Sequence, residues 1–151
     1  IYGAKSYLSE RPEIKSRDDL LLHPFIGYIQ DMIFAPGLDY LGDVHPGIRP
    51  RFQSSSISAQ LTATLQGQGL CILPHFIARR QPDLELVLPR EVQLTRHYYL
   101  VRHRDMSRIP RVRAVADYLD DRSRRICQLE TERKPARGAQ PAAGIADHRA
   151  R

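Results

Sequence analysis

One stretch of the sequence, residues 51–74, most restricts the fold that this chain can adopt. A short apolar segment runs into three serines at positions 54–56, and residues with apolar side chains at helical spacing follow. The glycines of the segment 67–69 interrupt that helix, and another apolar run then ends at Pro74. Strands and helices that alternate with short connections predict an α/β fold with a mainly parallel sheet.

The rest of the chain continues the alternation. We expect strands at residues 23–29, 51–54, 70–73, 84–88 and 97–101, and helices at 36–44, 56–66, 75–80 and 110–129. The helix after the serines carries its apolar face on Ile57, Leu61 and Leu65. The inner stripe of the last helix is expected to be Val112, Val115, Leu119 and Ile126.

Parallel sheets of this class bind ligands in a crevice outside the carboxyl ends of their strands. This rule nominates the loops after Ile29 and after Gln53 as binding edges. The hydroxyls of residues 54–56 and the backbone N–H groups of the helix that follows suit a carboxylate or another small anion. Simple capping of the helix by a serine explains the same residues, and the sequence leaves the two interpretations equal.

The net charge of +6 lies at one end of the chain. Residues 1–100 carry ten basic and ten acidic side chains, and residues 101–151 carry thirteen and seven. From about residue 132 the sequence is rich in Ala, Arg, Pro and Gly, which predicts a disordered basic tail. No run of 18 apolar residues suggests a membrane span, and two cysteines are too few for a disulfide framework, which mildly favours a reducing cytoplasm.

No catalytic constellation emerges from the sequence. The six histidines are scattered, so neither a metal site nor a cofactor site is expected, and Cys71 within an apolar run suggests a buried thiol. The Gly-x-Gly of residues 67–69 follows a helix and precedes a strand, the reverse of a dinucleotide-binding turn. We therefore interpret these glycines as a helix C-cap. Because no nucleophile, metal or cofactor pattern is present in the sequence, we also expect a protein that is not an enzyme.

Five segments together resemble the effector-binding domain of LysR-type transcriptional regulators. They are Phe52–Ile57 with the helix 61–65 and Gln66–Pro74, Tyr2–Leu8, Asp18–Leu20 followed by His23, Tyr98–Val101, and Pro110–Ala114. Each motif is weak alone, but together they follow the family's order over roughly residues 1–129. The resemblance implies a bilobal fold like that of type 2 periplasmic binding proteins.

The resemblance also implies a division of the chain. Residues 1–11 would be a crossover from lobe one, 12–95 lobe two, 96–130 the returning crossover strand and C-terminal helix of lobe one, and 131–151 the basic tail. The family's helix-turn-helix, linker helix and first half of lobe one would lie upstream of Ile1 and are expected to be missing from this chain. Promoter DNA would be contacted only through that helix-turn-helix, in a homodimer or homotetramer.

The family places effector contacts in three regions. In this chain they correspond to the loop with Ile29, Gln30, Asp31 and Phe34, to the strand end with Gln53, Ser54 and Ser55, and to the returning crossover near Tyr98. The resemblance implies that the effector is a small molecule. Serine hydroxyls and glutamine amides can bind many small acids or neutral metabolites. Three alternatives stay open: a bilobal solute-binding protein without DNA binding, an enzyme of the same α/β class, and a non-functional remnant.

Overall fold

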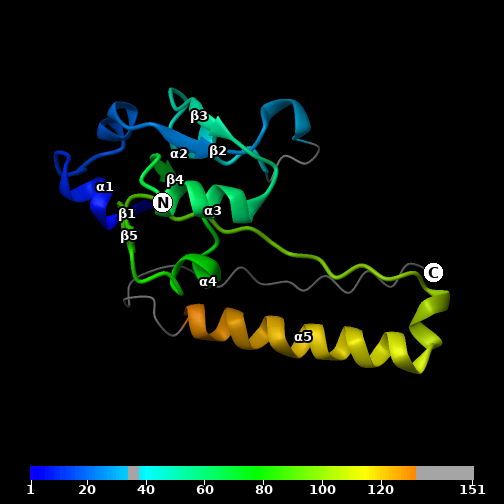
Figure 1. Ribbon diagram of the computed structural model, residues 1–151. Helices are drawn as coiled ribbons and strands as arrows, with labels where there is room; N and C mark the ends of the chain where they lie inside the picture. The colour runs from blue at the N-terminus through cyan, green and yellow to red at the C-terminus, as the bar shows by residue number, and fades with distance from the viewer. Residues whose placement is uncertain (34–37, 132–151) are drawn as a thin grey trace. The chain divides into compact units, whose positions relative to one another are not determined.

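The computed structural model describes residues 1–33 and 38–131, with side chains as far as residue 127. Two units divide the chain: Ile1–Met106 contains the sheet, and Ser107–Arg151 contains the long C-terminal helix (Figure 1). The expected disordered tail from residue 132 and the expected helix start at Pro36 lie outside the described residues.

Short strands and helices alternate through the first unit, as the sequence predicts. They are β1 (Tyr2–Ala4), α1 (Lys5–Ser9), η1 (Asp18–Leu22), β2 (Phe25–Gly27), η2 (Gln30–Met32), α2 (Leu41–Val44), β3 (Pro50–Gln53), α3 (Ile57–Leu65), β4 (Leu70–Cys71), α4 (His75–Ala78) and β5 (Leu84–Leu86). A 3₁₀ turn, η4 (Asp105–Arg108), then leads to α5 (Pro110–Thr131).

The five strands form one sheet in the order β3-β2-β4-β1-β5. β2 is parallel to both β3 and β4, whereas β1 is antiparallel to both β4 and β5. It follows that β2, β3, β4 and β5 all run in one direction and that β1 alone is reversed. The mainly parallel sheet is therefore confirmed, but β1 makes it mixed, and the sequence pattern did not indicate that strand.

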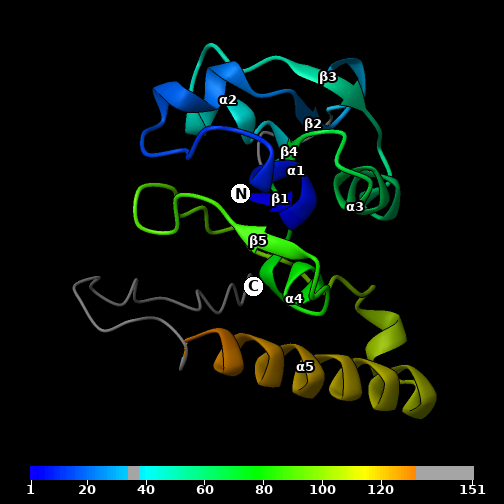
Figure 2. The ribbon, with the colours of Figure 1, turned by 60° about the vertical axis from the view of Figure 1, so that its left-hand side comes forward.

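Helices cover both faces of the sheet, and the alternation of side chains along the strands decides which residues they cover. Phe25 and Leu70 belong to one buried cluster, and their neighbours Ile26 and Cys71 belong to another. The first cluster includes residues of α1 and α2, and the second is packed by residues of α3 and α4 (Figures 1 and 2). The hydrophobic core is thus two layers, one on each side of β2 and β4.

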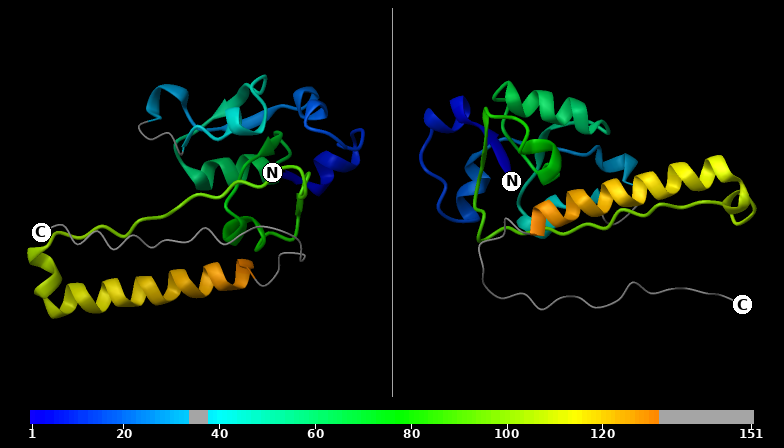
Figure 3. Two further views of the ribbon diagram at one scale, coloured as in Figure 1. Left: turned by 180° about the vertical axis from the view of Figure 1, so that it is seen from behind. Right: turned by 90° about the horizontal axis from the view of Figure 1, so that it is seen from below.

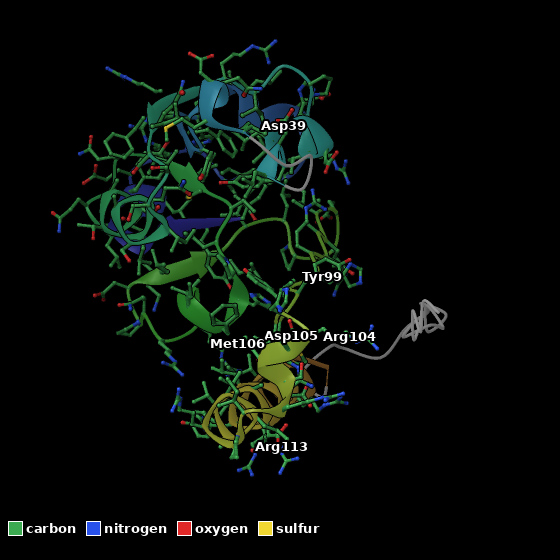
Figure 4. The ribbon with its side chains drawn as sticks, turned by 90° about the vertical axis from the view of Figure 1, so that its right-hand side faces the viewer. Asp39, Tyr99, Arg104, Asp105, Met106 and Arg113 are labelled. Carbon is green, nitrogen blue, oxygen red and sulfur yellow. The ribbon has the colours of Figure 1, made fainter. Side chains whose placement is uncertain are left out.

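The predicted strand at residues 97–101 is wrong. The backbone there has no regular structure, and Tyr98, Tyr99 and Val101 are 77%, 82% and 87% exposed. Figures 3 and 4 show the segment as an irregular trace between β5 and η4, with Tyr99 on it apart from the sheet. Backbone groups adopt a strand only when a neighbouring strand pairs with them, and this segment pairs with neither outer strand of the sheet, β3 or β5.

Two predicted helix faces differ from the observed ones. On α3, Leu61 and Leu65 pack against the core as expected, but Ile57 is 37% exposed and the fully buried side chains are Gln60 and Thr64. On α5, Val115 and Leu119 are 59% and 43% exposed. An apolar stripe is buried only where another surface lies on it.

In the described ranges no helix is both long and apolar enough to cross a membrane.

The turn between α3 and β4 confirms the interpretation of its glycines as a helix cap. Gly67 and Gly69 have φ angles of +70° and +144°, which side chains rarely allow. The amides of Gly67 and Gln68 donate to the carbonyls of Thr64 and Ala63, which closes the helix. A Cβ on Gly69 would collide with the Pro24 carbonyl.

We predict that Gly69→Ala destabilises the protein by about 3 kcal/mol, because the new methyl group meets both a forbidden φ and the backbone before β2. The matched control is Gly42→Ala in α2, where a Cβ meets nothing within 4 Å. Helix propensity predicts that this second change is neutral or stabilising by up to about 1 kcal/mol. Urea denaturation of the two variants measures both effects, and equal midpoints would contradict the prediction.

A second constraint links α1 to the chain before β2. The buried Tyr7 hydroxyl lies 2.9 Å from Nδ1 of His23, and the Arg11 guanidinium stacks 4.4 Å from the centre of the Tyr7 ring. Burial lowers the pKa of His23 from its ordinary value of 6.5, Arg11 lowers it further, and Asp19 opposes the shift. His23 therefore favours its neutral form in the folded protein.

This pKa shift predicts a pH dependence of stability. Because the folded-state pKa of His23 is below the unfolded value, the unfolded chain binds more protons, so His23 stabilises the fold above about pH 6.5 and loses that contribution as the pH falls through the folded-state pKa. We expect His23→Gln to flatten the change in unfolding free energy between pH 7.5 and pH 5. Identical pH profiles in urea denaturation would refute the role of His23.

Candidate functional site

The two loops nominated as binding edges lie side by side. In the parallel pair β2 and β3, Gly27 is opposite Gln53, so both strands end at the same edge of the sheet. The Ser54 amide donates to the Gly27 carbonyl at 3.0 Å, and the Gln30 amide donates to Oε1 of Gln53 at 3.4 Å. We call this place, residues 28–32 and 53–56, the β2–β3 edge.

Most of the residues predicted to contact an effector therefore gather at the β2–β3 edge. Ile29 precedes the turn η2 and is half-buried, whereas Gln30 and Asp31 on that turn are exposed. Gln53, Ser54 and Ser55 follow on the neighbouring strand end. The remaining predicted loop residue, Phe34, lies outside the described residues.

The three serines at the start of α3 have different partners. Oγ of Ser56 accepts from the Ala59 amide at 3.4 Å, so Ser56 is the N-cap. Oγ of Ser54 accepts from the Ser56 amide at 3.1 Å. The Ser55 side chain is exposed, and within the described residues its hydroxyl forms no hydrogen bond. The structure thus divides the serines: one caps the helix, one fixes the turn, and Ser55 keeps its hydroxyl for solvent or a ligand.

The wall behind the edge is polar. Gln60 of α3 is 1% exposed, and its Nε2 donates to the Ser54 carbonyl at 2.6 Å. Its Oε1 accepts from the Tyr40 hydroxyl at 3.3 Å and lies 3.7 Å from Sγ of Cys71. The sequence pattern did not indicate Gln60 or Tyr40, because a glutamine on an amphipathic helix is typical of a solvent-facing position. The available signal was its spacing, four residues after Ser56 and four before Thr64.

Tyr98 is not joined to the other predicted residues. Its ring is 6.3 Å from that of Phe76 in α4, and the side chain is otherwise 77% exposed. α4 follows β4, which is parallel to β2 and ends at the same side of the sheet. Tyr98 is therefore placed against the helix that follows the adjacent strand end, without a described contact to Gln30 or Ser55.

Two titratable groups behind the edge, Cys71 and Tyr40, are held neutral. Burial raises the pKa of the Cys71 thiol to about 12, so it is protonated at neutral pH and is not a nucleophile. Burial also raises the pKa of Tyr40 far above its usual value, which keeps the phenol as a hydrogen-bond donor. Among the described residues, no three His, Cys, Asp or Glu side chains form a group that could hold a metal ion. The edge offers hydroxyls, amides and backbone N–H groups, and it also carries the exposed carboxyl of Asp31.

Comparison of the chain with known proteins shows the family to which it belongs. No curated protein and no solved structure matches the chain significantly. The family model described as the LysR substrate binding domain matches residues 1–124. This range contains the whole sheet, the β2–β3 edge and more than half of α5. The chain therefore belongs to the family of LysR substrate-binding domains, which have the fold of type 2 periplasmic binding proteins.

Proposed function

We propose that this chain is the effector-binding part of a LysR-type transcription regulator and that it binds a small organic acid at the β2–β3 edge. The observation that supports this most is the exposed Ser55 hydroxyl at the N-terminus of α3, beside Gln30 and Gln53 on the same sheet edge. Backbone N–H groups of a first helical turn lack intrahelical partners and attract negative charge. A carboxylate matches these donors, and it would bind at Ser55 and the first turn of α3, since the η2 part of the edge carries the acidic residue Asp31.

In this proposal the domain binds its ligand without converting it. The neutral Cys71 thiol supports a binding role, because a protonated buried thiol cannot attack a ligand. The loop with Phe34 would belong to the lobe-two side of the site, and the returning segment with Tyr98 would complete it on the side of lobe one. Residues 12–95 would form lobe two, with 1–11 and 96–130 leading from and to lobe one.

The proposed signal is a change in lobe orientation. An effector that binds one orientation more tightly than another shifts the population toward it. In a homodimer or homotetramer in the cytoplasm, this shift would move the helix-turn-helix domains that contact promoter DNA, and effector binding and DNA binding would then be coupled.

The division of the serines predicts their effects on stability. Ser56→Ala should lower the unfolding free energy by about 1 kcal/mol, because the helix loses its N-cap acceptor. Ser55→Ala should change it by less than about 0.5 kcal/mol, because the hydroxyl has no partner in the described fold. Chemical denaturation measures the unfolding free energy of both variants. A larger loss of unfolding free energy in Ser55→Ala than in Ser56→Ala would show that Ser56 is not the N-cap.

Ligand binding tests the function itself. We predict that one or more of acetate, succinate, benzoate and glycine raises the melting temperature of the chain and is recovered unchanged by NMR. Ser55→Leu should abolish the increase by filling the edge, whereas Ser6→Leu, an exposed serine on α1, should retain it.

Three outcomes would count against the proposal. A full response in the Ser55→Leu variant would move the site elsewhere. Conversion of the ligand would identify an enzyme. The absence of a response to all four acids would reject an organic acid as the effector.

A further inference from the structure

Gln60 is an unusual residue to bury in a short helix. α3 has nine residues, and its two fully buried side chains, Gln60 and Thr64, are both polar. A buried amide is costly unless its polar atoms are hydrogen-bonded. The Thr64 hydroxyl donates to the Gln60 carbonyl at 2.7 Å within its own helix, and the Cys71 thiol is its other hydrogen-bond partner. The contacts of the Gln60 side chain lie outside its own helix.

Its amide group joins three other parts of the fold. Nε2 holds the carbonyl of Ser54 at the end of β3, and Oε1 meets the Tyr40 hydroxyl before α2 and the Cys71 thiol on β4. At 2.6 Å, the bond to Ser54 is the shortest of these contacts. Gln60 thus connects the centre of the sheet to the turn that carries the exposed serine.

The bond to Ser54 determines the direction of a second group. A trans peptide is planar, and its C=O and N–H groups point in opposite directions. The Ser54 carbonyl points at the buried Gln60, so the N–H of Ser55, in the same peptide, points away from Gln60. The Ser54 amide and hydroxyl are also engaged, with Gly27 and Ser56. All the polar groups of Ser54 are therefore fixed by the protein.

We propose that Gln60 is the positioning residue of the effector site, which presets the Ser55 N–H and hydroxyl as donors to a ligand carboxylate. The proposal rests on the proposed function and adds its mechanism: Gln60 makes no contact with the ligand and acts through the Ser54–Ser55 peptide. A preset donor spares the ligand the entropic cost of ordering the turn. The specificity of the edge would then originate in a buried side chain.

The test compares Gln60→Met with Thr64→Val. Both changes remove one buried polar side chain from α3 and keep its approximate size, but Thr64 has no described bond to the β2–β3 edge. In Gln60→Met we expect the exchange protection of the Ser54 and Ser56 amides, which donate to the Gly27 carbonyl and to Oγ of Ser54, to fall at least about tenfold relative to Thr64→Val, with a shifted Ser55 amide resonance. We also expect weaker binding of the acid that stabilises the wild-type chain, by about tenfold.

A second variant covers the case in which Gln60→Met does not fold. Gln60→Glu keeps the shape and the acceptors for Tyr40 and Cys71. Its protonated form can donate to the Ser54 carbonyl, whereas its ionised form repels it. We therefore expect the protection factors of the Ser54 and Ser56 amides in Gln60→Glu to be low at pH 7.5 and to rise when the pH is lowered to 5.5, whereas those of wild type and Thr64→Val should not change.

The outcomes separate this proposal from the proposed function. Wild-type protection of the Ser54 and Ser56 amides at pH 7.5 in both Gln60 variants would overturn the positioning role. A loosened turn with unchanged affinity for the acid would overturn its link to binding. A loosened turn in a chain that binds none of the four acids would reject the proposed effector class while the Gln60–Ser54 positioning itself stands.

Discussion

The pairing of β2 with β3 on one side and with β4 on the other is the constraint on which the rest of this structure depends. Both pairings are parallel, so three strands end at one edge of the sheet, and each is followed there by a helix or 3₁₀ turn. Parallel strands cannot be joined by a tight hairpin and need a crossover. The helix α3 is the crossover that joins β3 to β4, on the two sides of β2. Its N-terminus is consequently placed at the shared edge.

The return from α3 into β4 depends on a close backbone approach. Gly69 packs against the Pro24 carbonyl, and the same carbonyl accepts from the Leu70 amide at 2.9 Å. This contact sets the start of β4 beside the start of β2, because Leu70 then pairs with Phe25. Gly69 thus does more than allow a turn: it sets the register of the central strand pair. The register in turn places Cys71 beneath α3, within reach of Gln60.

Many elements of both units could be predicted from sequence because they are set by local patterns. In the first unit β2, β3, α3, β4, α4 and β5, and in the second unit α5, lie where apolar runs, caps and turn residues indicate them. Six of the eight predicted site residues gather at the β2–β3 edge, since the direction of parallel strands is enough to bring their loops together. Their role in binding stays a prediction.

Features that depend on distant partners could not be predicted in the same way. β1 is a three-residue strand whose place between β4 and β5 comes from pairing with residues about seventy to eighty positions away. The segment 97–101 has the β-branched and aromatic composition of a strand but pairs with no described strand, so composition alone misleads. Gln60 is hidden for a related reason: its burial follows from where α3 packs, and the helical pattern favours Ile57 instead.

The charge distribution agrees with a site whose proposed donors to the ligand are neutral groups. The balanced charge of residues 1–100 gives the sheet unit no general attraction for anions. On α5, the exposed Arg124 and Arg125 pair with Asp120 and Asp121 at 2.9 Å, which offsets part of the positive charge there. Selection of an acid at the β2–β3 edge would thus depend on the direction of a few donors. Direction is a property of fixed peptides, and the buried side chain that fixes the Ser54–Ser55 peptide is Gln60.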